Sequence, residues 1–328
     1  MVRQASTPTS PRFLVLGAGA IGGYFGGKLA QSGLAVEFLV RPKRAAQLAR
    51  NGLVLKTHEG ESRSIVRTRL AGEVEPRYDC ILMCCKAYDL HAAIDAIAPA
   101  IGPKTSILPF LNGVKHLDAL GSRFPGQVLG GLTAVNAALG SDGAIVQSAV
   151  KVDMTAFGEL DGTRSDRCVA IEQAFAVAGL KATLGTTVVA SMWTKFAAFC
   201  AIASIVTLCR SRAGSIAAAP ASSAFVAAAI DECRRVVTAY GYDLPGGMRE
   251  IIAGLFTHRE SRYGPSILFD MEQGRPTEAA HTIGDMVEKA MLAGVSAPLS
   301  LAALCNLQVY EEGERNRIPA DRDFRTYV

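Results

Sequence analysis

Residues Phe13–Gly27, FLVLGAGAIGGYFGG, decide the fold of the first part of this chain. The apolar run Phe13–Leu16 has the length of a buried strand and leads without a spacer into Gly17-Ala18-Gly19-Ala20-Ile21-Gly22. A segment of helical character then runs to Gly33. Strand, tight turn and helix form the setting in which G-x-G-x-x-G binds a dinucleotide, whereas an isolated glycine-rich turn is only structural.

Each glycine of this turn has a separate expected role. Gly17 permits the turn, Gly19 lets the backbone approach a pyrophosphate, and Gly22 lets the helix pack closely on the strand. The first N–H groups of the helix and its positive dipole end then favour phosphate binding. We therefore expect cofactor contacts from all six turn residues: Gly17, Ala18, Gly19, Ala20, Ile21 and Gly22.

A second strand over 36–40 ends at Arg41-Pro42-Lys43-Arg44. In a dinucleotide-binding fold this strand end faces the adenosine ribose, where an acidic residue binds the 2′-hydroxyl of NAD and an arginine accommodates the 2′-phosphate of NADP. The run carries Arg41 and no acidic residue. It predicts NADP(H) as the cofactor; a solvated basic loop is the alternative.

Two further apolar runs end in polar residues. The run over 80–85 reads as a parallel strand buried on both faces, and Lys86 follows it. The run over 105–110 leads to Asn112. Open α/β sheets bind ligands at the carboxyl ends of their strands, so both side chains are candidates for the same crevice. Other expected elements are a hairpin-like pair at 52–55 and 64–66, strands at 127–135, 144–150 and 153–157, and helices at 45–52 and 166–178.

The pattern changes near residue 186, where strand-like runs give way to Ala- and Leu-rich segments of helical spacing. These expected helices cover 189–208, 222–240, 246–256, 265–273, 278–293 and 298–312. The fold class is therefore α/β: a flexible tail at 1–11, a Rossmann-type dinucleotide-binding domain at 12–186 and an all-helical substrate and catalytic domain at 187–328.

Composition excludes several other classes of protein. The net charge of +4 and the lack of a Lys/Arg-rich run argue against nucleic acid as a partner. The eight cysteines lack C-x-x-C spacing, so we expect free thiols in a reducing cytoplasm and no metal site. We expect the polar residues 1–11 to be a flexible tail and not a signal peptide, and we expect no membrane span.

The combined motifs resemble the ketopantoate reductase (2-dehydropantoate 2-reductase) family over nearly the whole chain. They are Gly17–Gly23, Arg41, Cys85-Lys86-Ala87-Tyr88, Leu111-Asn112-Gly113, Trp193-Thr194-Lys195, Ser266-Ile267-Leu268-Phe269-Asp270 and Arg275-Pro276-Thr277-Glu278. The resemblance implies NADPH-dependent reduction of a small-molecule 2-oxo acid, by default 2-dehydropantoate to pantoate in pantothenate biosynthesis. It leaves a homodimer as one option for the assembly.

The resemblance also implies roles for individual residues. Lys195 matches the general acid, Glu278 a site-orienting partner that is also a cofactor contact, and Ser266 a substrate hydrogen-bonding residue. Asn112 matches a residue that touches cofactor and substrate, Lys86 one that reaches the cofactor, and Ala138 a backbone cofactor contact.

The chemistry of carbonyl reduction explains why a lysine suits this place. Hydride arrival at a ketone carbon leaves an alkoxide, which needs a positive donor nearby. A lysine in a desolvated cleft can serve, because burial brings its pKa toward neutrality. The alternatives are a surface lysine for Lys195 and a first-turn helix residue for Glu278 and for Ser266.

Three positions depart from the family pattern. Where the family usually has asparagines, this chain has Phe199, Ala203 and Ala213. Phe199 and Ala203 lie four and eight residues after Lys195, so they share its helix face and are expected to line the substrate pocket. Either other groups nearby in sequence (Ser204, Thr207 and Arg210) replace the amides, or the enzyme reduces a less polar 2-oxo acid or ketone. An NADP-binding regulatory protein without turnover is the alternative from another class.

Overall fold

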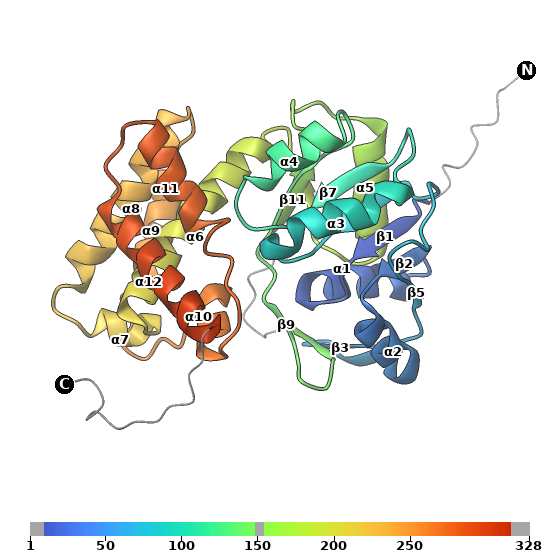
Figure 1. The fold of residues 1–328 in the computed structure, drawn as a ribbon, viewed down its shortest axis with the longest axis horizontal. Helices are drawn as coiled ribbons and strands as arrows, with labels where there is room; N and C mark the ends of the chain where they lie inside the picture. Colours follow the sequence, from blue (N-terminus) through green and yellow to red (C-terminus); the bar gives the residue numbers. More distant parts are fainter. Residues whose placement is uncertain (1–9, 148–153, 316–328) are drawn as a thin grey trace, which may run out of the picture. The chain divides into compact units, whose positions relative to one another are not determined.

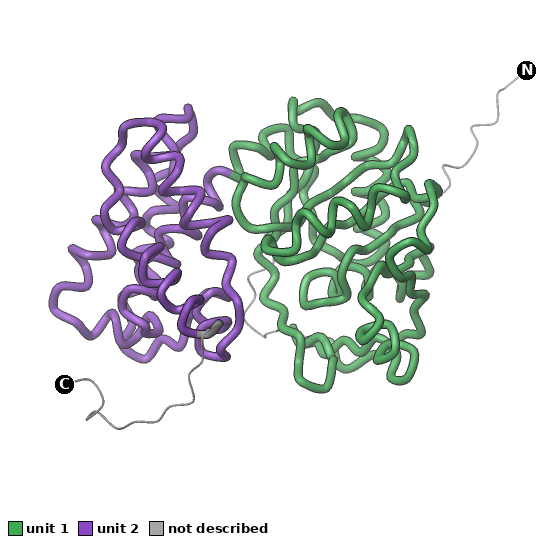
Figure 2. Tube along the Cα trace, in the orientation of Figure 1, with its two compact units in different colours: residues 1–192 green, residues 193–328 purple. Residues whose placement is uncertain are grey.

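The computed structural model describes residues 10–147 and 154–315. It divides into two compact units, residues 1–192 and 193–328, shown in separate colours in Figure 2. The division falls inside helix α6 (Val188–Cys209), which begins just after the expected domain boundary at residue 186. Most of the expected tail at 1–11 lies outside the described residues.

A five-stranded parallel sheet forms the centre of the first unit (Figure 1). Its order is β5-β2-β1-β6-β7, and its strands are β1 (Phe13–Leu16), β2 (Val36–Leu39), β5 (Arg67–Arg69), β6 (Cys80–Met83) and β7 (Ser106–Pro109). All four neighbouring pairs are parallel. Because β1 lies between β2 and β6, the strand order reverses beside β1, which is where open α/β sheets bind their ligands.

Alternating residues of β1 face two different cores. Phe13 and Val15 belong to a buried cluster with residues of α1 (Ala20–Gln31) and α5 (Asp166–Val177). Leu14 and Leu16 belong to a second cluster with residues of α3 (Leu90–Ile97) and α4 (His116–Arg123). A strand sends successive side chains to opposite faces, so helices cover both faces of this sheet.

Two small sheets complete the unit. One has the order β4-β3-β10-β9, with β3 (Leu53–Thr57), β4 (Gly60–Ser64), β9 (Ala137–Leu139) and β10 (Ile145–Gln147). The other has the order β12-β11-β8, with β8 (Gly130–Thr133), β11 (Thr155–Gly158) and β12 (Thr183–Leu184). Helix α1 packs closely on both the parallel sheet and the first small sheet: a Cβ on Gly26 would lie 2.5 Å from Phe38 of β2, and one on Gly27 would lie 2.8 Å from Leu55 of β3.

The structure confirms the α/β class and corrects several element boundaries. The expected hairpin exists, but its second strand is Gly60–Ser64, and Ile65 is 99% exposed beyond it. The helix expected at 45–52 already begins at Pro42 as α2 (Pro42–Asn51), since proline suits the first turn of a helix. The strand expected at 144–150 is observed over Ile145–Gln147, and its remainder lies outside the described residues.

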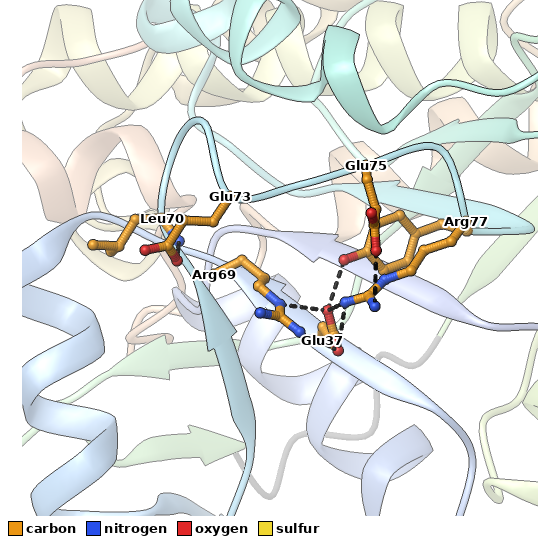
Figure 3. Close-up of polar contacts among 7 residues, drawn as sticks. Glu37, Arg69, Leu70, Glu73, Glu75 and Arg77 are labelled. Atoms are coloured by element: carbon orange, nitrogen blue, oxygen red, sulfur yellow. Dashed lines mark hydrogen bonds and ion pairs between the residues drawn. The ribbon is translucent and has the colours of Figure 1, made fainter.

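A buried carboxylate connects the strands on one side of this sheet. Glu37 of β2 accepts hydrogen bonds from Arg69 at the end of β5, from Arg77 and from the Tyr78 hydroxyl, and Figure 3 shows the two arginines converging on it. Its side chain is only 12% exposed. The hydrogen bond from Arg69 and those from Tyr78 and Arg77 lower the pKa of Glu37 to about 2, against the opposing effect of burial. The network ties β2 to β5 and to the segment before β6.

The described part of the second unit, residues 193–315, contains helices and no strand. Besides α6 these are α7 (Ala213–Ala217), α8 (Ser222–Ala239), α9 (Gly246–Gly254), α10 (Ser266–Glu272), α11 (Ile283–Leu292) and α12 (Pro298–Arg315). Buried Glu232 of α8 accepts hydrogen bonds from the Leu299 and Ser300 N–H groups and so caps the N-terminus of α12. By length and composition α6 could cross a membrane, but 67% of its most apolar window is buried, as in the core helix of a soluble protein.

Candidate functional site

The three motif glycines of the turn that follows β1 differ in what surrounds them. Gly17 has a φ of +92°, which side chains disfavour. A Cβ on Gly22 would lie 1.9 Å from the Gly17 carbonyl oxygen, so α1 could not pack on the turn with any larger residue. A Cβ on Gly19 would meet nothing within 4 Å. Packing within the described residues therefore does not require glycine at 19, and the approach of a pyrophosphate to this open position at the N-terminus of α1 stays a prediction.

The basic residues after β2 divide into two kinds. Arg44 Nε donates to the Ala18 carbonyl at 3.0 Å, and its Nη1 donates to Gln47 and to the Gly143 carbonyl. Arg41, at the start of α2, has a 76% exposed side chain and pairs with Asp89 at 2.7 Å. Arg44 is thus built into the support of the turn, while Arg41 is the accessible guanidinium at this strand end.

The other expected cofactor residues of this unit lie in three places. Lys86 follows β6 and precedes the short helix η1 (Ala87–Asp89), and Asn112 follows β7; both are half-buried. Since β6 and β7 are neighbours in the parallel sheet, the two residues come from the same sheet edge as the glycine turn. Ala138 lies instead in the small sheet, exposed on β9 and paired with Val146 of β10. Its role as a cofactor contact stays a prediction.

The helical unit brings Lys195 and Glu278 into electrostatic contact. Lys195 lies in the first half of α6, and Glu278 is 7% exposed. Burial lowers the pKa of Lys195 to about 8, and the Glu278 carboxylate opposes that shift by favouring the charged ammonium. A lysine with a pKa near 8 can give up and regain its proton near neutral pH, which an ordinary surface lysine does not do.

An aromatic stack holds the helix turn that carries Lys195. The Trp193 ring stacks on Tyr242 at 4.6 Å and on Tyr240 at 5.3 Å between ring centroids. Thr194 Oγ1 donates to the Asp243 carbonyl at 3.2 Å. Lys289 Nζ lies 5.5 Å from the centre of the Trp193 ring. These contacts restrict the rotation of α6 about its axis and so position Lys195.

Glu278 lies in a turn ahead of α11, which corrects an expectation. The helix expected over 278–293 begins only at Ile283, so Glu278 is not a first-turn helix acid. Its neighbour Thr277 directs both its N–H and its hydroxyl to the Glu311 carboxylate of α12. The Glu278 carbonyl accepts from the Thr282 hydroxyl at 2.8 Å. A long-range contact of Thr277 and a local hydrogen bond from Thr282 therefore fix the backbone on both sides of Glu278.

Apolar side chains occupy the three positions at which the family usually has asparagines. Ala203 has no exposed surface and belongs to a buried cluster with Ile267 of α10 and Ala279, and Phe199 packs against that cluster. The cluster therefore contains the chain neighbours of two predicted site residues: Ile267 follows Ser266, and Ala279 follows Glu278. Ser266 itself is exposed as the first residue of α10, and Ala213 is fully buried. Because Ala203 is completely buried, its side chain packs inside the protein in this structure. A contact of Ala203 with the substrate therefore stays a prediction.

Two contacts of the candidate site were not predicted from the sequence: Asp89 pairs with Arg41, and Glu311 accepts from Thr277. Asp89 comes directly after the Cys85–Tyr88 motif. Its position shortly after a predicted strand could have marked it as a residue at the ligand-binding edge of the sheet. Glu311 is 34 residues from Thr277, and no sequence spacing connects them. Within residues 10–147 and 154–315, no three His, Cys, Asp or Glu side chains gather as candidate metal ligands. The described cysteines are free thiols, and burial raises the pKa of Cys233 to about 12.

Comparison with known proteins agrees with this arrangement. Residues 13–162 match the family model described as ketopantoate reductase PanE/ApbA, and residues 187–311 match the model of its C-terminal part. An uncharacterized oxidoreductase, YkpB, of Bacillus subtilis is 35% identical over 92% of this chain and 99% of its own length. The 2-dehydropantoate 2-reductase of Mesorhizobium japonicum is 28% identical over 85% of this chain and 93% of its own.

The fold is also similar to that of a solved enzyme with a different activity. D-mandelate dehydrogenase, in a ternary structure with NADH and anilino(oxo)acetate, matches with a TM-score of 0.82 at 21% identity. The match covers 92% of this chain and 99% of that one. One fold therefore carries at least two named activities, and the site residues have to decide between substrates.

Proposed function

Because this chain belongs to the ketopantoate reductase family, we propose that it is an NADPH-dependent reductase that converts a 2-oxo acid into a 2-hydroxy acid. The observation that carries the proposal is the burial of Lys195, which lowers its pKa to about 8 and so suits it to act as a general acid. A nicotinamide cofactor bound in the first unit would supply the hydride for the carbonyl carbon. Lys195 supplies the proton to the carbonyl oxygen, and water returns it to the lysine.

The residues of the first unit would hold the cofactor. The open space at Gly19 and the N–H groups at the start of α1 favour the pyrophosphate, and the exposed Arg41 favours a 2′-phosphate. Lys86 and Asn112, from the same sheet edge, are proposed as further contacts. The cytoplasm is the proposed compartment, in keeping with the free thiols.

The substrate is proposed by default to be 2-dehydropantoate, which would place the enzyme in pantothenate biosynthesis. One observation favours a second candidate, a 2-oxo acid with an apolar substituent. The cluster of Phe199, Ala203 and Ile267 offers no polar group where family members carry amides. The anilino(oxo)acetate held by D-mandelate dehydrogenase shows that this fold accommodates a bulky aromatic oxo acid in that protein.

A panel of 2-oxo acids tests both candidates. The purified chain is mixed with NADPH and with ketopantoate, branched aliphatic oxo acids or aryl oxo acids, and NADPH absorbance is followed. We expect at least one of these oxo acids to oxidise NADPH. In Lys195→Met we expect turnover to fall about a hundredfold or more while the affinity for NADPH is retained. Lys181→Met removes an exposed lysine and is the matched control. NADPH binding without oxidation by any compound would instead support a regulatory protein.

A further inference from the structure

The Arg41–Asp89 ion pair spans the cofactor edge of the parallel sheet. Arg41 follows β2 and Asp89 follows β6, and these two strands flank β1 on opposite sides. Arg41 Nη2 nevertheless lies 2.7 Å from Asp89 Oδ1. The two side chains therefore meet across the carboxyl end of β1, where the glycine turn begins.

Two exposed cations of this run, Arg41 and Lys43, can turn toward a phosphate, and of these Arg41 is the guanidinium paired with Asp89. Arg44 is held by the Ala18 and Gly143 carbonyls. The Arg41 side chain is 76% exposed and that of Asp89 is 32% exposed, so solvent weakens their attraction and a ligand can separate them. The end of η1 and the start of α3 fix the backbone of Asp89. A phosphate that binds Arg41 therefore lies close to the Asp89 carboxylate.

We propose that Asp89 is a specificity-determining residue that competes with the cofactor 2′-phosphate for Arg41. The inference rests on the proposed function, in which a nicotinamide dinucleotide binds at this edge. Two anions that share one guanidinium repel each other, so Asp89 weakens the binding of NADPH. NADH lacks this phosphate, and a carboxylate near its ribose can accept from the 2′-hydroxyl. Asp89 therefore narrows the difference in affinity between the two cofactors.

Dissociation constants of the full chain for NADPH and NADH, measured by calorimetry, test the proposal. In Asp89→Asn we expect NADPH to bind about tenfold more tightly and NADH to bind equally or more weakly. Asp95→Asn removes an exposed acid from α3 and controls for a general change in charge. Because the neutral amide of the Asp89→Asn variant no longer holds the guanidinium as an ion pair, Arg41→Ala should cost more NADPH affinity in that background than in the unmodified chain.

The outcomes separate this inference from the proposed function. If both nucleotides bind and Asp89→Asn leaves the ratio of their dissociation constants unchanged, the competition does not exist and only this inference falls. An equal gain in NADPH affinity from Asp95→Asn would also overturn it, because the effect would then be one of net charge. If neither nucleotide binds any variant, the proposed function fails and this inference fails with it.

Discussion

Arg44 Nε donates a hydrogen bond to the carbonyl oxygen of Ala18 at 3.0 Å, so α2 supports the glycine turn from outside. The same guanidinium binds the Gly143 carbonyl ahead of β10. Arg44, which belongs to the basic run after β2, is thus part of the framework that supports the glycine turn. Its neighbour Arg41 pairs instead with Asp89.

Arg41 and Arg44 should therefore have different effects on cofactor affinity. We expect Arg44→Ala to weaken NADPH and NADH by similar factors, since it loosens the turn that both share. Arg41→Ala should weaken NADPH by about tenfold or more and leave NADH nearly unchanged, because a charge-assisted contact to a phosphate is lost. Dissociation constants of both cofactors check this. A selective loss of NADPH in Arg44→Ala would show that Arg44 reaches the phosphate after all.

The sequence predicts the elements that are encoded by neighbouring residues better than those that depend on contacts between residues far apart in the chain. The strand at Phe13–Leu16 and its glycine turn are encoded within one short continuous stretch, and the structure shows both. Strand β5 escaped prediction because Arg67–Arg69 has no apolar pattern; it is held by pairing with β2 and by the Arg69–Glu37 ion pair. Helix α11 starts only at Ile283, and Thr277 ahead of it hydrogen-bonds to Glu311 of α12, a contact that the sequence does not reveal.

The candidate site shows the same division. Motifs that are continuous in sequence identify Gly17–Gly22 and Lys195, but the pKa of Lys195 depends on burial by the folded chain. Asp89 and Glu311 act through partners 48 and 34 residues away, and only the folded chain reveals those contacts.

The three motif glycines allow a prediction that separates packing from ligand binding. Gly22→Ala places a methyl group 1.9 Å from the Gly17 carbonyl oxygen, so we expect a loss of about 3 kcal/mol or more in stability. Gly19→Ala meets nothing within 4 Å and should cost no more than about 1 kcal/mol, as expected at a helix N-cap. Its cofactor affinity should nevertheless fall at least tenfold. Thermal unfolding and cofactor titration of both variants provide the comparison, and normal NADPH binding by Gly19→Ala would contradict the placement of the pyrophosphate.

The pKa of Lys195 predicts the pH dependence of the reduction. The reaction consumes the protonated lysine, so kcat/KM should be level below about pH 8 and fall about tenfold per pH unit above it. The Glu278 carboxylate raises this pKa, so its removal in Glu278→Gln should move the fall to lower pH. Rates measured from pH 6 to about 10 test the sign. A shift to higher pH in Glu278→Gln, or the same shift in the control Lys181→Met, would contradict the assignment.

The apolar residues on α6 support a last prediction, about substrate choice. Phe199 packs against the cluster that contains Ala203, Ile267 and Ala279, and we expect it to disfavour a hydroxylated substrate. A polar substrate group left without a partner costs about 1–3 kcal/mol. We therefore expect higher kcat/KM for oxo acids with an apolar branch than for ketopantoate, and a reversal of this order in Phe199→Asn.

Ala203 needs a separate variant, because its side chain has no exposed surface. Ala203→Asn places an amide in the buried cluster and should cost about 1–3 kcal/mol in stability through overpacking. Phe199→Asn alone is therefore the informative change, and Phe199→Leu is its control, since it reduces volume without adding a hydrogen-bonding group. The reversal should occur in Phe199→Asn and not in Phe199→Leu. If the unmodified chain already prefers ketopantoate and Phe199→Asn reduces it more slowly, other side chains bind the substrate hydroxyl and the pocket beside Lys195 is not apolar.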